Sequence, residues 1–327
     1  MEDPSATHAA SEAVLAGEQQ IQGRSLSQIA WGRLRRDKVA LSGGLFIVFL
    51  ILVAILAPLI VKITGGPPNE FHQDLMNPVI PDLPAGSFGG MSWDHPMGLE
   101  TVNGRDILSR VLYGARISLL IAILATALSV VIGTVLGVVA GFFGGWIDAM
   151  LSRIMDMFLA FPILVFAIAL TGVIPDQAFG LSGLSLRLTL LVFVIGFFSW
   201  PYIGRIVRGQ TISLREREYV EAARSLGATW PYILRTELLP NLMAPILVYS
   251  TLIIPTNILF EAALSFLGVG VQPPTATWGA MIAEATNIFD IAWWFMLAPG
   301  IALVLTVLAF NLVGDGLQDA LNPKGDR

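Results

Sequence analysis

The sequence predicts an all-α integral membrane protein with six transmembrane helices. Of its 327 residues, 55% are hydrophobic and 13% are charged, whereas a soluble domain contains roughly 25% charged residues. Six stretches with few charges each approach or exceed the roughly 17 to 25 residues that a helix needs to cross the hydrocarbon core. Because backbone amides in lipid must be hydrogen-bonded within their own segment, these stretches are expected to be helices and not strands of a barrel.

The expected elements follow in order along the chain. Residues 1–23 are polar and lack periodicity, which predicts a disordered cytoplasmic tail. Residues 24–38 combine an apolar face with arginines, which predicts an interfacial amphipathic helix. A cytoplasmic tail is expected at 316–327. The transmembrane domain is expected to cover 39–315, with spans at about 39–61, 117–142, 156–174, 187–206, 240–262 and 291–314.

The distribution of basic residues predicts which side each loop occupies. Most of the 19 lysines and arginines share one side if both termini are cytoplasmic, and cytoplasmic loops carry the excess of such residues. The Pro- and Gly-rich loop at 62–115 is then external, and its length favours short helices or a docking surface. The arginine-rich loop at 207–239 is cytoplasmic. No apolar signal-peptide core precedes the first span, which is therefore expected to be retained.

The composition argues against several kinds of catalysis in this chain. Cysteine is absent, and the three histidines, at positions 8, 72 and 95, lie outside the expected spans. An intramembrane Ser/His hydrolase or an HExxH metalloprotease therefore lacks its histidine. No lysine lies in a Walker A motif. We expect a non-enzymatic chain without a metal site or a cofactor of its own.

A short amphipathic helix is expected in the cytoplasmic loop. Tyr219, Ala222, Ala223 and Leu226 are spaced at i, i+3, i+4 and i+7, and charged residues, among them Glu221, occupy the other side. Gly227 follows the last apolar residue, where glycine readily forms a left-handed cap. The helix is expected either to insert into a groove on a partner protein or to pack on its own bundle.

A second helix is expected after this turn. Thr229 is a suitable N-cap, and Pro231 lies in the first turn, where a missing N–H is harmless. Pro240 is expected to end this helix, and Asn241 to cap the fifth span. The loop would then be a helix, a glycine turn and a second helix.

Few polar residues lie within or beside the spans. Asn257 and Glu261 are one turn apart in the fifth span and are candidates for lining a translocation path, because charges at membrane depth commonly mark function. Glu261 could instead cap the loop that follows. Arg153 and Asp156 are expected to form a structural ion pair.

A ridge of small residues runs along the second span. Gly133, Gly137 and Gly141 are spaced at i, i+4 and i+8. Such a ridge favours close helix packing, either within the bundle or against a partner subunit.

The cytoplasmic loop resembles the EAA loop of ABC-importer permeases, the element that docks onto the ATPase subunits. Glu221, Ala222 and Ala223 are followed by Gly227 after three residues and by Leu239-Pro240 at the end of the motif. Glu237 stands where that family has an aliphatic residue.

Three further segments resemble the C-type permeases of dipeptide, oligopeptide and nickel importers: DHPMGLETVNGRDILSRVLYGARISL, LSFLGVGVQPPTATWGAMI and FNLVGDGLQDALNPK. The family's external G-T-D-x-x-G-R-D motif has Glu100 in place of its first Asp and one additional residue before Gly104.

The resemblance implies the type I ABC importer permease fold and a place in a prokaryotic inner or plasma membrane. It implies three kinds of partner besides lipid: a second homologous permease, two ATPase subunits or one two-domain ATPase, and an extracytoplasmic solute-binding protein. ATP and Mg²⁺ would bind to the ATPase partners, and no nucleic acid is expected. Tyr219, Glu221, Ala222, Ala223, Leu226 and Gly227 would form the ATPase-coupling element. The implied substrates are di- or oligopeptides, with a nickel chelate or another small solute as the alternative.

Two other classes of membrane protein remain as alternatives. An ATP-independent secondary transporter or channel would show inverted repeats or paired intramembrane charges, and neither is evident in the sequence. An intramembrane aspartyl enzyme would need two acids, but Asp156 and Asp315 both fall at cytoplasmic span ends.

Overall fold

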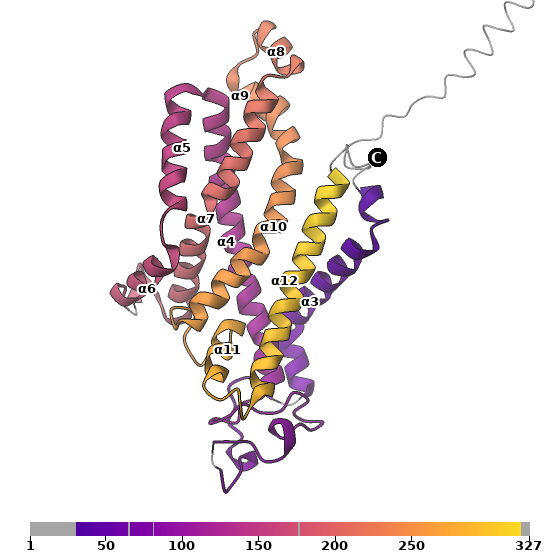
Figure 1. Ribbon diagram of the computed structural model, residues 1–327, viewed down its shortest axis with the longest axis vertical. Helices are drawn as coiled ribbons and strands as arrows, with labels where there is room; N and C mark the ends of the chain where they lie inside the picture. Colours follow the sequence, from indigo (N-terminus) through magenta and orange to yellow (C-terminus); the bar gives the residue numbers. More distant parts are fainter. Residues whose placement is uncertain (1–30, 65, 81, 176, 322–327) are drawn as a thin grey trace, which may run out of the picture.

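Long apolar helices form the bundle in the computed structural model, which describes residues 31–64, 66–80, 82–175 and 177–321 (Figure 1). Within these described residues, five helices are long and apolar enough to cross a membrane: α3 (Lys38–Thr64), α4 (Ile107–Phe143), α7 (Gly183–Arg215), α10 (Leu239–Phe266) and α12 (Trp293–Leu321). The pair α5 (Gly145–Leu159) and α6 (Ile163–Val173) passes the same test together. Counting this pair as one span confirms the six-span, all-α prediction.

The third span is broken, and α6 turns away from the bundle (Figure 1). The axes of α5 and α6 differ by 75°, and Pro162 is the N-cap of α6. Proline lacks the N–H that a continuous helix needs, and it disfavours helical geometry at the residue before it. The segment expected as one span at 156–174 is therefore two helices.

Several boundaries differ from the expected ones. Helix α4 begins ten residues earlier than residue 117, because its first turns are buried beneath the external loop. Helix α12 continues past residue 315 to Leu321, so the first part of the expected tail is helical. The tail at 1–23, residues 24–30 of the interfacial helix and residues 322–327 lie outside the described part of the chain; residues 31–34 are helical.

The glycine ridge of α4 packs against α7 of the same chain. A Cβ atom added at Gly133 would lie 2.7 Å from the carbonyl oxygen of Trp200, and one added at Gly137 would lie 2.6 Å from that of Gly204. The two backbones are thus close enough that only glycine fits. This contact settles the choice left open by the sequence in favour of packing within the bundle.

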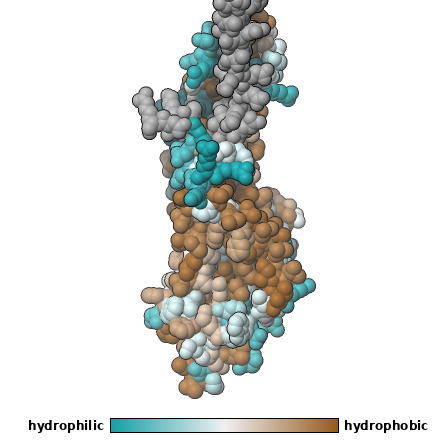
Figure 2. Space-filling model, turned by 90° about the vertical axis from the view of Figure 1, so that its right-hand side faces the viewer, coloured by the Kyte–Doolittle hydropathy of each residue, from teal (hydrophilic) through white to brown (hydrophobic). Residues whose placement is uncertain are grey.

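Apolar side chains cover the flank formed by α3 and α12, where Figure 2 shows a hydrophobic belt with hydrophilic residues above it and a mixed surface below it. Leu45, Phe49 and Ile55 of α3 and Val304 and Leu308 of α12 are exposed there. A soluble protein rarely exposes an apolar area of this kind, so the belt is a surface that contacts lipid or another membrane subunit.

The loop at 62–115, which the sequence predicts to be external, forms a cap, the external cap, at one end of the bundle. It contains two short 3₁₀ helices, η1 (Gln73–Leu75) and η2 (Ser87–Gly89), in agreement with the expectation of short helices. Helix α11 (Trp278–Thr286) packs beside this end, and a small hairpin of β1 (Gln177–Ala178) and β2 (Leu181–Ser182) joins α6 to α7.

At the opposite end lie α8 (Glu218–Ser225), α9 (Trp230–Tyr232) and a π-helical segment η3 (Ile233–Leu238) that leads into α10. Helix α8 projects beyond the ends of the other helices (Figure 1).

Candidate functional site

One residue anchors α8 to the bundle. Val220 is fully buried and belongs to a cluster that includes Ile203 and Val207 of α7 and Ile233 and Leu238 of η3. Burial of a valine side chain stabilises such a contact by about 1.5–3 kcal/mol. Val220 was not among the residues singled out from the sequence, although its spacing to Ala223 and Gly227 (i, i+3, i+7) marks the inner face of the helix.

The outer face of α8 borders an open groove. Leu226 is 88% exposed and Tyr219 is 40% exposed. The groove has a volume of about 610 Å³ and is lined by Tyr219, Ala222, Ala223, Leu226, Gly227, Ala228, Thr229, Tyr232 and Glu237. Five of the six predicted coupling residues therefore lie together. Glu221 is exposed on the same helix but is not part of the groove lining.

The turn after α8 has the geometry that the sequence predicts. Gly227 has φ +83°, and its N–H donates to the carbonyl of Arg224 at 2.9 Å. The N–H of Ala228 donates to the carbonyl of Ala223 at 3.0 Å. Because a positive φ is unfavourable for residues with a side chain, glycine at this point fixes the direction in which the chain leaves α8.

The helix that follows does not end at Pro240, contrary to the prediction. Thr229 is the N-cap and Pro231 lies in the first turn, but the chain stays helical through η3 into α10. The wider π turn lets the N–H of Leu239 donate to the carbonyl of Leu234. This local widening accommodates the missing N–H of Pro240 without breaking the helix.

Asn241 does not cap a new span, because α10 continues the preceding helix. Its side-chain amide donates to the carbonyl oxygen of Glu237 at 2.6 Å and lies 3.5 Å from the hydroxyl of Tyr219. Asn241 therefore links α10 to the edge of the groove. Glu237, at the position where the EAA pattern has an aliphatic residue, lines this groove.

Asn257 and Glu261 are fully buried on α10. The Asn257 amide donates to the hydroxyl of Thr126 on α4 at 2.8 Å, and Ser199 on α7 donates to its carbonyl at 3.4 Å. Glu261 accepts a hydrogen bond from Ser265 at 2.7 Å. In this conformation Asn257 joins three helices, and a role for either residue in the path stays a prediction.

Two ion pairs join α5 to α7. Asp156 pairs with Arg205, and Asp148 accepts from Arg208 at 2.7 Å. The predicted pair of Asp156 with Arg153 is therefore wrong. The closer partner comes from a helix that is adjacent only in the tertiary structure.

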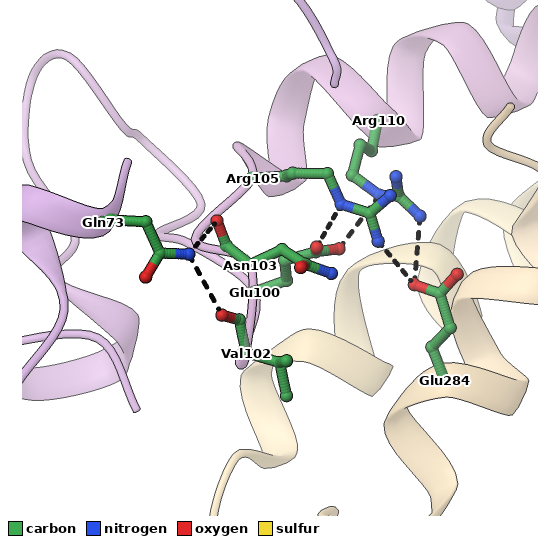
Figure 3. A network of polar contacts seen from close by, with 7 residues as sticks. All are labelled: Gln73, Glu100, Val102, Asn103, Arg105, Arg110 and Glu284. Carbon is green, nitrogen blue, oxygen red and sulfur yellow. Dashed lines mark hydrogen bonds and ion pairs between the residues drawn. The ribbon is translucent and has the colours of Figure 1, made fainter. Parts of the chain in front are cut away.

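Four charged residues tie the external cap to the bundle (Figure 3). Arg105 pairs with Glu100 within the cap, and Arg110 of α4 lies 3.1 Å from the same carboxylate. Both arginines also contact Glu284 of α11, at 3.2 and 3.0 Å. Burial raises the pKa of the Glu100 carboxyl, whereas the charges of Arg110 and Arg105 act in the opposite direction.

Asp106 organises the junction between the cap and α4. Its carboxylate accepts from the N–H of Ser109 at 2.7 Å as the N-cap of α4, and its other oxygen lies 2.9 Å from Nδ1 of His95. Glu100, Arg105 and Asp106 belong to the external motif recognised in the sequence. Their connection to Glu284 required the fold.

Among the described residues, no group of three or more His, Asp and Glu side chains is arranged to hold a metal ion. The clusters above are ion pairs and hydrogen bonds that join helices. They position structural elements relative to one another.

Residues 133–326 match the family described as binding-protein-dependent transport system inner membrane component. Residues 25–78 match the N-terminal transmembrane domain of oligopeptide transport permease C.

The chain is also similar to curated proteins over most of its length. It is 44% identical to the glutathione transport system permease protein GsiD of Salmonella typhimurium (strain LT2), over 90% of this chain and 89% of that protein. The proteins of the same name from Shigella flexneri and Escherichia coli O6:K15:H31 are 42% and 41% identical over the same shares.

One solved structure, described as inward-facing conformations of the MetNI methionine ABC transporter, has a similar fold. The TM-score is 0.53 at 21% identity, over 66% of this chain and 98% of the solved one. At that identity the similarity concerns the fold alone.

Proposed function

Because this chain belongs to the binding-protein-dependent inner-membrane components, as a permease subunit of a bacterial ABC importer of the peptide and oligopeptide family, we propose that it carries peptides and that α8 couples it to a separate ATPase. The family membership establishes the type I permease fold and a non-catalytic role in the membrane. The substrate, the partners and the coupling residues are parts of the proposal.

The groove beside α8 is the observation that carries the coupling part. Leu226, Trp230 and Tyr232 are more than half exposed at a hydrophilic end of the molecule, outside the apolar belt. Exposed apolar side chains around a groove mark a protein interaction surface. An ATPase subunit would receive α8 and its turn in a cleft of its own, in the manner of a helix in a groove.

The helix path explains how a movement at this surface would reach the membrane. The segment from Trp230 to Phe266 is a single long helix, so a displacement of the α8 end is transmitted along α10 to the level of Asn257 and Glu261. Closure of two ATPase subunits on ATP and Mg²⁺ would thus tilt α10 against α4 and α7. This is a rigid-body transition driven from outside the chain.

The proposed assembly contains four kinds of component. This permease pairs with a second homologous permease, docks on two ATPase subunits or one two-domain ATPase, and accepts substrate from an extracytoplasmic solute-binding protein. We place both termini and α8 in the cytoplasm, since most basic residues lie on that side.

The proposed substrates are di- or oligopeptides, supported by the name of the similar proteins, which refers to the tripeptide glutathione. A nickel chelate or another small solute is the alternative within the same family. Uptake of a labelled dipeptide, in competition with a longer peptide and with a nickel chelate, distinguishes these substrates.

The coupling proposal is tested with a charge placed in the groove. Ala222 is exposed and lines the groove, so Ala222→Glu should leave the fold intact. The complete complex, reconstituted with its binding protein, should lose ATPase stimulation and uptake in this variant. Ser225→Glu, on the same helix but outside the lining, is the matched control. Wild-type coupling in Ala222→Glu would exclude this surface as the docking site.

The alternative of an ATP-independent transporter or channel is addressed by the same preparation. It would show uptake driven by an ion gradient without ATP, and no ATPase subunit would co-purify with the chain from the membrane.

A further inference from the structure

A cavity lies where the third span is broken. It has a volume of about 330 Å³ and is bounded by α5, α6, α7 and α10, within the range of roughly 300 to 1,000 Å³ for small-molecule sites. Aromatic rings and hydroxyl groups form much of its lining, among them Phe158, Phe161, Phe198, Tyr202, Tyr249 and Thr256. Such a lining suits an organic solute with an apolar side chain and a polar backbone.

The ion pair between Asp156 and Arg205 stands beside this cavity. On α7, Arg205 lies seven residues after Phe198 and three residues after Tyr202, so all three are on the face of the helix that borders the cavity. Asp156 precedes the lining residue Leu159 on α5 by three residues. One turn of helix rises about 5.4 Å, so both charges lie within roughly a turn of the lining, toward the end that carries α8.

This ion pair is more exposed to solvent than the second ion pair between α5 and α7. Asp156 and Arg205 are 49% and 52% exposed, whereas Asp148 and Arg208, which join the same two helices, are 20% and 33% exposed. Charges in the spans of a membrane protein are costly and commonly mark a substrate path. An exposed carboxylate and guanidinium next to an aromatic cavity offer one charge of each sign to a ligand.

We propose that this cavity, with Asp156 and Arg205, is a transient binding site for a zwitterionic peptide during its passage. The peptide ammonium pairs with Asp156, the peptide carboxylate pairs with Arg205, and a side chain lies among the aromatic rings. The assignment rests on the peptide-importer function proposed above and adds the residues that recognise the cargo.

Charge exchange explains why such a site would both accept and release its ligand. While the site is empty, the two protein charges neutralise each other. When the peptide enters, each charge changes partner, and no unpaired charge is left in either state. Partly exposed ion pairs are weak, so the peptide is held loosely enough to move on when α10 shifts.

The test uses the complete complex in nanodiscs and a dipeptide carrying a photoreactive benzophenone side chain. Cross-linking to this permease is expected to fall by about fivefold in Asp156→Asn and in Arg205→Gln, which is the range of a partly exposed ion pair. Asp156→Glu, which keeps the charge, should restore cross-linking. An N-acetylated dipeptide, which lacks the ammonium, should be insensitive to Asp156→Asn.

Asp148→Asn is the matched control, because it removes the other ion pair between α5 and α7. An equal loss of cross-linking in this variant would show that the loss results from a weakened contact between α5 and α7, and it would overturn the inference. Wild-type cross-linking in both Asp156→Asn and Arg205→Gln would also overturn it, while uptake by the wild-type complex would leave the peptide-importer function standing. If the wild-type complex transports no peptide, that function fails and the cargo site fails with it.

Discussion

Replacement of Val220 by alanine should distinguish effects of the position of α8 from effects of the side chains on its proposed ATPase-docking face. Val220 is fully buried against α7 and η3, and Val220→Ala removes two methyl groups. At about 0.8 kcal/mol for each buried carbon, with a further cost for the cavity left behind, the loss is about 2 kcal/mol. Because 1.4 kcal/mol corresponds to about a factor of ten, the population in which α8 is detached should rise about 30-fold.

Hydrogen exchange measures this detachment in the permease alone. The N–H groups of Leu226 and Ala228 donate to Ala222 and Ala223 at 3.0 Å, so their exchange rates report on α8 and its turn. Both should exchange faster in Val220→Ala, while amides in the middle of α4 should be unaffected. Stimulation of the ATPase should fall in parallel, since the docking surface is less often in place.

Leu226→Ala is the matched variant. Leu226 is 88% exposed, so its truncation should leave the exchange rates of α8 unchanged and still weaken ATPase stimulation. If Val220→Ala exchanges at the wild-type rate, the buried contact does not hold α8, and the reasoning is refuted.

Three further predictions concern packing and the external cap. Gly137→Val would place a Cβ atom 2.6 Å from the carbonyl oxygen of Gly204, so the detergent-solubilised protein should lose about 1–3 kcal/mol of stability and melt at a lower temperature. Gly209→Ala is the control, because a Cβ atom at Gly209 meets no neighbouring atom. Equal melting temperatures of the two variants would contradict the close packing of α4 and α7. Asp106→Ala removes the N-cap of α4 and should cost about 1 kcal/mol in thermal unfolding, whereas Asp106→Asn should retain most of this contribution; equal stabilities of the two variants would argue against the cap. Glu284→Ala deprives two buried arginines of a partner and should lower the stability of the cap by about 1–3 kcal/mol. Proteolysis of the cap should therefore be faster in Glu284→Ala than in Glu284→Gln. Unchanged proteolysis would show that these ion pairs do not hold the cap in place.

If the chain carries peptides, as we propose, the question follows of which subunit selects among them. If Asp156 and Arg205 bind the charged termini of the peptide, they recognise a feature that many peptides share. Side-chain preference would then depend on the solute-binding protein and on the shape of the aromatic cavity. Exchange of the binding protein alone should therefore change which peptides are transported without abolishing the effect of Asp156→Asn.

The amino-acid sequence was sufficient to predict the membrane class, the six spans and the short helix at 218–225. Each of these depends on local properties: the length of an apolar run decides whether a segment crosses lipid, and the spacing of Tyr219, Ala222, Ala223 and Leu226 decides which face of a short helix is apolar. The glycine turn at Gly227 is local as well, because it depends on the backbone freedom of one residue.

Tertiary structure alone decided the partners of these local elements. Asp156 pairs with Arg205 and not with its neighbour Arg153, because α7 lies alongside α5. Glu284 meets Arg105 across 179 positions of sequence. The proline at position 162 breaks a span, whereas Pro240 is absorbed by a π turn. In each case several arrangements satisfy the local chemistry, and the packing of distant helices selects one of them.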